Sequence, residues 1–244
     1  MDFTIFRNEQ DMARQTADEI AQDLRRNPRQ LLCVAAGFTS VGLFRELADR
    51  CRRGELDFSR ASFVAMDEWL DMDADTEGSC GWLLRTELIT KVNYQEGNVF
   101  LFNGKNRDYA SECARAVQFI QDHAIGHSID FLVLGTGMNG HLALNEPGTA
   151  LTQRAHAAEL DASTARVGQK YFQAPVTLRG GLTLGLADFQ EAARTILLIS
   201  GSRKSGVLQK LKAAGSFQPD VPATAVYAFH HAAVYCDQDA ARGG

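Results

Sequence analysis

The segment NGHLALNEPG contains a histidine and a glutamate whose types suit proton transfer. His141 follows a glycine-rich stretch, and Glu146 stands five residues later, directly before Pro147. A histidine titrates near neutral pH, and a nearby carboxylate can fix its tautomer and raise its basicity. A lone histidine is more often structural or exposed, and a spacing of five on a loop does not ensure contact. Because the glycines and the Glu-Pro pair constrain this loop, we predict catalytic roles for both residues.

Asp67 and Glu68 form a second candidate pair, directly after the apolar run SFVAM. Neighbouring side chains on a strand point to opposite faces, so at most one of the two carboxylates is expected to face a site. The alternative is a solvated acidic turn. The position at a strand end favours Asp67 as a second catalytic carboxylate.

Three glycines have the spacing Gly135-x-Gly137-x-x-Gly140, which formally matches a dinucleotide-binding fingerprint. That fingerprint needs a helix that begins at once. Here the chain continues as HLALNEPG, and the NEPG ending breaks a helix. We therefore predict no nicotinamide or flavin cofactor, and we expect Gly137 to let the backbone approach a small substrate.

The segment AGFTS has features of a phosphate-binding turn. Gly37 permits unusual backbone angles, and Thr39 and Ser40 can cap a helix that begins near Val41. Free N–H groups of such a turn, that of Phe38 included, can hold a phosphate. The alternative is an ordinary capped turn without a ligand. No Gly-Lys-Ser/Thr follows, so this is not a Walker A loop.

Two lysines are candidate partners for the same phosphate. Lys204 lies at the expected start of a helix after an apolar run, where a cation beside helix N-terminal amides suits an anion. Lys170 in GQKYF is the weaker candidate. Many lysines in such positions are simply surface residues.

Two groups of potential metal ligands do not match a metal-site pattern. His141, Glu146 and His156 lack the helical spacing of a zinc motif. An acidic run superficially resembles a calcium loop, but Thr76 and Trp82 stand where the turn glycine and the bidentate glutamate belong. We predict no metal site, and a solvated loop at the acidic run Asp71, Asp73, Asp75 and Glu77.

Short apolar runs alternate with amphipathic stretches along the chain. The runs that predict buried strands are Leu31–Ala35, Ser62–Met66, Ile129–Leu134, Thr195–Ile199 and Ala233–Cys236. The stretches that predict helices are Asp11–Arg25, Val41–Cys51, Gly81–Val92, Asp108–His123 and Lys204–Ala213. The alternation indicates an α/β fold: one doubly wound, mainly parallel, Rossmann-like sheet with helices on both faces, in a single domain over residues 1–244. Ligands bind past the carboxyl ends of such strands, so we expect one composite site there.

Composition restricts the class of protein. The chain is 45% hydrophobic and 23% charged with a net charge of −5, which is typical of a globular protein. An acidic balance without a Lys/Arg-rich block disfavours nonspecific nucleic-acid binding, and no apolar stretch reaches the roughly 18 residues of a membrane span. The N-terminus has no apolar signal segment, and the five cysteines include no CxxC pair, so we expect reduced thiols and a cytoplasmic location.

Together these motifs resemble the glucosamine/galactosamine-6-phosphate deaminase–isomerases, which share a fold with the 6-phosphogluconolactonases. The resemblance covers nearly the whole chain and is carried by AAGFTS, MDEW, GTGMNGHLALNEPG, LTLGL, ISGSRKS and VPATAVYAFHHAAVYCD. The NEPG ending is typical of the deaminases, whereas the lactonases usually continue with a GHTASLFP-like sequence. NGH…NEPG combined with GQKYF…VTLRGGLTLGL is most similar to the galactosamine-6-phosphate branch.

The resemblance implies conversion of galactosamine 6-phosphate or glucosamine 6-phosphate to a ketose 6-phosphate and ammonia, in amino-sugar catabolism. By motif match, His141 opens the sugar ring, Glu146 polarises His141, and Asp67 moves a proton from C2 to C1. No cofactor is implied, because an aldehyde or iminium at C1 already acidifies C2. The expected partner is a small sugar phosphate, with no nucleic acid or membrane, and the expected state is a monomer or small homo-oligomer. The alternatives are a 6-phosphogluconolactonase and a sugar-phosphate-sensing domain, although no DNA-binding helix pair precedes the domain.

The chain departs from the family pattern in three places. Asn139 stands where the glucosamine enzymes carry an aspartate that assists the histidine, so the pKa of His141 should fall and Glu146 should do more. Lys170 stands near the position where the family has an arginine that contacts phosphate. A lysine supplies a single ammonium charge, whereas an arginine can donate two parallel hydrogen bonds. The sequence ends soon after Asp237, without the longer C-terminal part of the allosteric hexameric enzymes, so we expect no such allostery.

Overall fold

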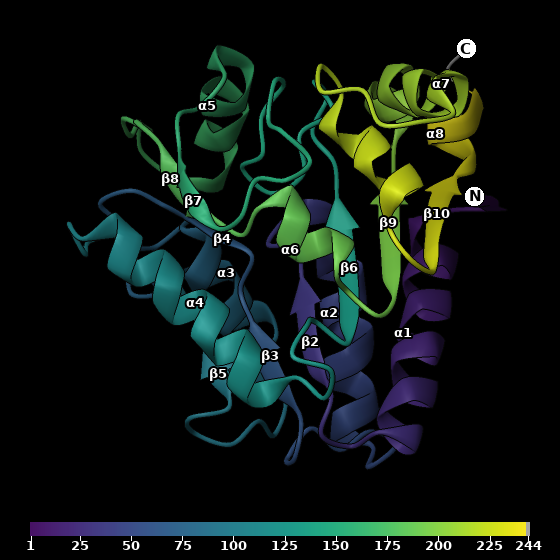
Figure 1. Ribbon diagram of the computed structural model, residues 1–244. Helices are drawn as coiled ribbons and strands as arrows, with labels where there is room; N and C mark the ends of the chain where they lie inside the picture. Colours follow the sequence, from purple (N-terminus) through teal and green to yellow (C-terminus); the bar gives the residue numbers. More distant parts are fainter. Residues whose placement is uncertain (243–244) are drawn as a thin grey trace.

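A seven-stranded sheet lies at the centre of the computed structural model, which describes residues 1–242 (Figure 1). Every pair of neighbouring strands in it is parallel. The fold class is therefore confirmed as a mainly parallel α/β sheet. Across the sheet the strands are β1 (Asp2–Phe6), β10 (Ala232–Asp237), β9 (Thr195–Ile199), β6 (Phe131–Gly135), β2 (Leu31–Val34), β3 (Ser62–Val64) and β5 (Val99–Phe100).

The strand order reverses between β2 and β6. From β2 the chain proceeds outward to β3 and β5, whereas from β6 it proceeds to β9 and β10 on the other side. The loops after β2 and β6 consequently diverge to opposite faces and leave a crevice between the carboxyl ends of these strands. The topology thus assigns a ligand site to the segments that follow Val34 and Gly135.

Helices cover both faces of the sheet. In Figure 1, α4 and α6 lie in front of it, and α1 and α2 pack side by side behind it, while α5 and α7 lie beyond the arrowheads of the central strands. The helices are α1 (Glu9–Arg26), α2 (Phe38–Arg52), α3 (Cys80–Glu87), α4 (Tyr109–His123), α5 (Ala162–Gly168), α6 (Leu186–Gln190), α7 (Ser205–Ala214) and α8 (Gln238–Arg242). Within the described residues, 3-10 turns occupy Ile89–Lys91, Gln169–Tyr171, Ser202–Lys204 and Pro222–Ala228.

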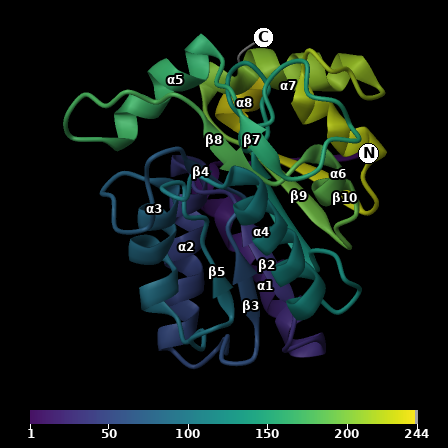
Figure 2. The same ribbon diagram turned by 60° about the vertical axis from the view of Figure 1, so that its left-hand side comes forward.

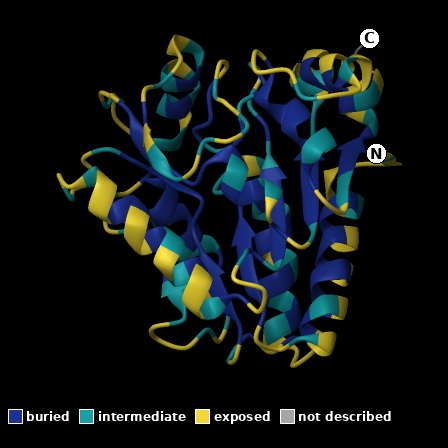
Figure 3. Ribbon diagram, in the orientation of Figure 1, coloured by how far each residue is buried: buried dark blue, intermediate teal, exposed yellow. Residues whose placement is uncertain are grey.

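The core explains why the central strands were predictable. All residues of β2 and β9 are buried, because helices cover the sheet on both sides and leave no polar face (Figure 3). Cys33 is fully buried in β2. Helix α1 begins two residues before its predicted start, since the Asn8 side chain accepts a hydrogen bond from the Asp11 amide and caps the helix.

A second, three-stranded antiparallel sheet was not predicted. It consists of β4 (Asp67–Trp69), β8 (Gly181–Thr183) and β7 (His156–Ala158), seen together in Figure 2. The expected strand Ser62–Met66 was too long: β3 ends at Val64, and Asp67 starts a new strand that pairs with Thr183. Strands of three residues are too short to show an alternation pattern, so they leave no recognisable signal in the sequence.

The two edge strands of the central sheet were also missed. β5 has only two residues, and β1 is mostly exposed, with Ile5 54% accessible. An exposed edge strand lacks the continuous apolar character of its buried neighbours. No helix within residues 1–242 is long and apolar enough to span a membrane.

Candidate active site

A cavity of about 730 Å³ lies at the carboxyl ends of the central strands. Segments at the ends of four of the five predicted strands line it: 35–40, 66–67, 135–138 and 200–204. A fifth wall comes from α5 and the 3-10 turn that follows it, through Thr164 and Tyr171 among others. The structure therefore brings together segments that are far apart in the sequence, at the crevice that the strand order creates.

His141 lies against this cavity and is held by two side chains. Its Nδ1 is 3.0 Å from Thr164 Oγ1 and 3.6 Å from Glu146 Oε2. A Cβ added at Gly137 would collide with the His141 ring, so only glycine fits there. Gly137 lines the cavity as expected, and its missing side chain also makes room for the imidazole.

Asn139 supports the loop and does not contact the imidazole. Its Nδ2 donates to Glu146 Oε2 at 2.8 Å, and its Oδ1 accepts from the backbone N–H of His141 at 3.2 Å. Neither Asn139 nor Glu146 is among the residues that line the cavity. Both therefore act on His141 from behind, on the side away from a bound ligand.

Burial favours the neutral form of His141. Desolvation, followed by the charge of Lys204, lowers its pKa to about 4. Burial also raises the pKa of Glu146, although hydrogen bonds from Thr164 and Asn139 act in the opposite direction. At neutral pH the imidazole is therefore uncharged and can accept a proton.

The adjacent carboxylates Asp67 and Glu68 have different surroundings. Asp67 lines the cavity, and burial raises its pKa to about 7, while a hydrogen bond from Cys80 acts in the opposite direction. Glu68 points away and accepts hydrogen bonds from the amides of Trp69 (2.8 Å), Cys80 (3.1 Å) and Gly81 (2.7 Å). Glu68 thus caps the start of α3 and ties it to β4, and the alternation of a strand explains why only Asp67 faces the site.

The AGFTS segment forms the start of α2, but not with the predicted cap. Gly37 is the N-cap and the helix begins at Phe38, so Thr39 and Ser40 lie in its first turn and do not cap it. The expected start near Val41 was wrong because Gly37 itself takes the extended N-cap conformation. All of Gly37, Phe38, Thr39 and Ser40 still line the cavity.

Cations surround this end of the cavity. Lys204 Nζ donates to Thr39 Oγ1 at 3.0 Å, and Lys170 Nζ lies 4.9 Å from the centre of the Phe38 ring. Burial, followed by the charge of Lys170, lowers the pKa of Lys204 to about 8. Two further cations, Arg166 and Arg203, line the same cavity. Within residues 1–242 neither Lys170 nor Lys204 forms an ion pair, so their charges are available to an anionic ligand.

Several lining residues were not predicted from the sequence. Thr164, Cys80 and Tyr171 line the cavity, and each contacts a predicted site residue: His141, Asp67 and Phe38, respectively. A helix start at Asp161 was visible in the sequence LDAST, since aspartate is a common N-cap. Nothing in the sequence linked that helix to His141.

The potential metal ligands are not assembled. His156 lies on β7 outside this cavity and contacts the carbonyl of Arg154, so it is separate from His141 and Glu146. Within residues 1–242 no group of three or more His, Cys, Asp or Glu has the arrangement of a metal site. The acidic run after β4 is partly ordered by contacts, since Asp73 accepts from Lys105 at 2.8 Å.

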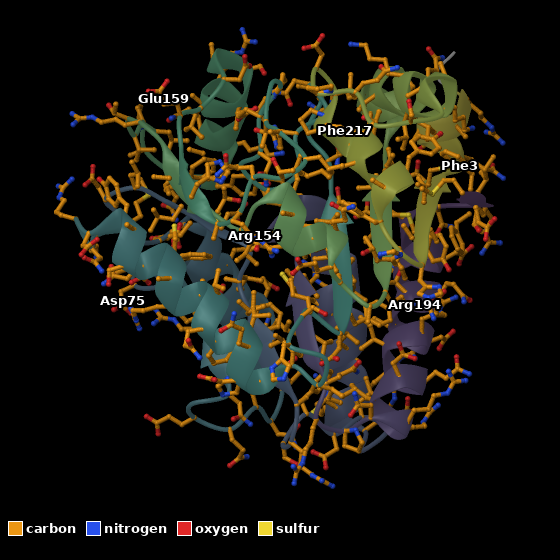
Figure 4. All side chains as sticks on the ribbon, in the orientation of Figure 1. Phe3, Asp75, Arg154, Glu159, Arg194 and Phe217 are labelled. Atoms are coloured by element: carbon orange, nitrogen blue, oxygen red, sulfur yellow. The ribbon has the colours of Figure 1, made fainter. Side chains whose placement is uncertain are left out.

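A second cavity of about 620 Å³ lies between α4 and β7. Its one arginine, Arg154, labelled in Figure 4, pairs with Asp188 and Glu191. Because these carboxylates neutralise Arg154, the second cavity offers no free guanidinium to an anion. The candidate phosphate-binding residues, Lys204, Lys170 and the first turn of α2, line the first cavity.

Comparison with known proteins identifies the family. A family profile described as glucosamine-6-phosphate isomerases/6-phosphogluconolactonase matches residues 7–235. The chain belongs to this family. A curated glucosamine-6-phosphate deaminase of Clostridium perfringens (strain 13 / Type A) is 32% identical over 243 residues, with 99% of both chains covered.

Other relatives extend the comparison. A glucosamine-6-phosphate deaminase of Bacillus pumilus (strain SAFR-032) is 30% identical over 241 residues, with 98% of both chains covered. A solved structure described as a monomeric glucosamine-6-phosphate deaminase superposes with a TM-score of 0.94 at 27% identity, covering both chains completely. A 6-phosphogluconolactonase from Thermotoga maritima shares the fold with a TM-score of 0.74 at 16% identity, covering 97% of this chain and 98% of its own.

Proposed function

We propose that this protein is an amino-sugar-6-phosphate deaminase/isomerase, which converts a hexosamine 6-phosphate and water to a ketose 6-phosphate and ammonia. The observation that carries this proposal is that one cavity combines two kinds of group. Lysines without ion pairs line it beside the start of α2, which we call the anion end, and a desolvated carboxyl and a neutral imidazole line it as well, which we call the reacting end. A sugar phosphate needs both kinds of group, because its charge is on C6 and its reactive carbon is C1. The names of the deaminase relatives point to the same chemistry.

The anion end is assigned to the phosphate. The N-terminal amides of α2, from Phe38 to Ser40, supply donors, and Lys204 and Lys170 supply positive charge. The protein carries a net charge of −5, so attraction of a sugar phosphate has to come from this local group of cations.

His141 is assigned to ring opening. A neutral imidazole can take the proton of the C1 hydroxyl and return a proton to the ring oxygen as the C1–O5 bond breaks, which gives the open-chain aldehyde. Glu146 and Asn139 hold the loop from behind and keep the ring oriented.

Asp67 is assigned to proton transfer between carbons. Its carboxylate removes the C2 proton, the resulting enolamine is protonated at C1, and water hydrolyses the C2 imine to the ketose with release of ammonia. A general base works best when its pKa lies near the working pH, and burial brings the pKa of Asp67 to about 7. No cofactor is needed, because the C1 carbonyl acidifies C2.

Within this class we propose galactosamine 6-phosphate as the preferred substrate over glucosamine 6-phosphate. The similarity of NGHLALNEPG and GQKYF to the galactosamine branch supports this preference. Asn139 also supports this preference. Its amide donates a hydrogen bond to Glu146, whereas an aspartate at this position could form that bond only if one of the two carboxyls were protonated. The hydrogen bonds of this loop therefore suit an amide at position 139, where the glucosamine enzymes carry an aspartate.

Incubation of the protein with each hexosamine phosphate, and separately with 6-phosphogluconolactone, tests the function. We expect ammonia release from a hexosamine phosphate, with a higher kcat/KM for galactosamine 6-phosphate, and no acid release from the lactone above the spontaneous rate. Acid release without ammonia would identify a lactonase, which is the second candidate because the fold is shared. A higher kcat/KM for glucosamine 6-phosphate would refute only the substrate preference.

We further propose a cytoplasmic location and a monomeric or small homo-oligomeric state. All five cysteines are free, which is typical of a reducing compartment. Size-exclusion chromatography with light scattering measures the oligomeric state directly, and a large assembly would contradict it.

A further inference from the structure

The hydroxyl of Thr164 is the nearest polar partner of the His141 ring. It lies 3.0 Å from Nδ1, closer than Glu146 Oε2 at 3.6 Å. The same hydroxyl oxygen accepts from Asn139 Nδ2 at 3.4 Å, and this amide also donates to Glu146 Oε2 at 2.8 Å. Thr164 and the carboxylate that is expected to orient the imidazole thus both face its Nδ1.

The hydrogens of this cluster can be assigned from donor and acceptor capacity. A threonine hydroxyl has one hydrogen to donate and two lone pairs to accept. The Glu146 carboxylate, 3.6 Å from Nδ1, favours a proton on this nitrogen, because an unprotonated Nδ1 would turn its lone pair toward a negative oxygen. The Thr164 hydrogen can then turn toward Glu146, in keeping with the lowering effect of Thr164 on the pKa of that carboxyl. The Thr164 oxygen then accepts from Asn139 Nδ2 and from the Nδ1–H of His141.

This assignment fixes the tautomer of the imidazole. A neutral histidine carries one ring hydrogen, so a proton on Nδ1 leaves the lone pair on Nε2. The Nδ1 side of the ring is occupied by the Thr164 contact, which leaves Nε2 for a substrate hydroxyl. With the opposite tautomer, His141 could not act as a base toward that hydroxyl.

Thr164 is well held for such a role. It is 5% exposed and lies in the first turn of α5, whose N-cap Asp161 accepts from the Ser163 amide at 2.8 Å. A β-branched side chain has restricted rotation about χ1, so the position of its hydroxyl is fixed with the helix.

We propose that Thr164 is a positioning residue that accepts the Nδ1 proton of His141, donates to Glu146, and thereby holds His141 in the tautomer that presents Nε2 to the sugar. The kinetic consequence rests on the proposed function, since it assumes that His141 opens the sugar ring. The tautomer itself is a property of the unliganded protein.

Nitrogen-15 NMR of histidine-labelled protein near neutral pH tests the tautomer, with His141→Asn to assign the signal. We expect wild-type His141 to show a protonated Nδ1 and an unprotonated Nε2. Thr164→Val, which has the same shape without the hydroxyl, should lose this preference, and Thr164→Ser should retain it. A wild-type spectrum with the proton on Nε2, or an unchanged spectrum in Thr164→Val, would overturn the proposal.

Kinetics with a hexosamine 6-phosphate provides the second readout. Thr164→Val should lower kcat about tenfold and change KM less than about twofold, with Thr164→Ser close to wild type. Ser163→Ala is the matched control, because this hydroxyl lies one residue earlier on α5 and contacts only Asp161. Equal kcat values for Thr164→Val and wild type would refute the kinetic consequence. If neither the wild type nor any variant releases ammonia, the proposed function fails, but the NMR spectrum still decides whether Thr164 sets the tautomer of His141. If Thr164→Val does not fold, the spectra of the wild type and Thr164→Ser decide this role.

Discussion

The proposed reacting end of the cavity, with Asp67 and His141, and the proposed anion end, with Lys170 and Lys204, both contain ionisable groups whose pKa values are shifted by desolvation. Burial raises the pKa of Asp67 to about 7 and lowers that of His141 to about 4. It also lowers the pKa of Lys204, but only to about 8, because a lysine starts near 10.5. The same desolvation therefore brings a carboxyl to the working pH at one end and leaves a cation at the other.

The largest test of this contrast is Asp67→Asn. If Asp67 is the base for the carbon-bound proton, kcat should fall about 1000-fold or more, because general-base catalysis has this magnitude. Exchange of the C2 hydrogen with heavy water, followed by proton NMR, should disappear. Binding of a non-reacting sugar-alcohol 6-phosphate, measured by calorimetry, should remain near wild type. Undiminished exchange at C2 would show that another group is the base.

The pH dependence tests the pKa values at the reacting end. Asp67 must be ionised to act as a base, and its pKa is raised to about 7, so activity is present above pH 7 and is lost as the pH falls below it. We expect kcat/KM to fall about tenfold per pH unit below about pH 7. His141, with its pKa lowered to about 4, should contribute no second limb between pH 5 and 7.

The sugar phosphate itself also titrates near this range, so the profile needs a control. The inhibition constant of a sugar-alcohol 6-phosphate, measured over the same pH values, reports phosphate ionisation without chemistry. If kcat/KM falls with pH only in parallel with the binding of this inhibitor, the pH profile gives no support to Asp67 as the base.

Lys204→Ala is the corresponding test of the anion end, with a smaller expected effect. Loss of one charge-assisted phosphate contact should raise KM about 30-fold and lower kcat much less. Lys210→Ala, an exposed lysine on α7 outside the cavity, is the control and should leave both constants unchanged. A constant KM in Lys204→Ala would mean that Lys204 does not bind the phosphate.

The fold was predictable where burial is complete. The five inner strand predictions match observed strands, because a parallel sheet covered on both faces needs continuous apolar runs such as Leu31–Val34. The edge strands β1 and β5 and the small sheet around β8 lack this signal, since they are partly exposed or only two or three residues long. The start of α2 was predicted too late in the sequence. Gly37 is its N-cap, but glycine has no polar side chain that would mark it as a cap.

The sequence by itself determined the residue types of the site and the strand ends that carry them. His141, Asp67, Lys204 and the AGFTS segment all follow apolar runs, and parallel strands bring their carboxyl ends to one edge. Only the tertiary structure decided which side chains meet. Thr164 contacts His141 across 23 residues, and Lys204 contacts Thr39 across 165. Periodicity and capping signals act over a few residues, whereas desolvation and these hydrogen bonds depend on packing between distant elements, so the pKa values and the partner of the histidine exist only in the folded chain.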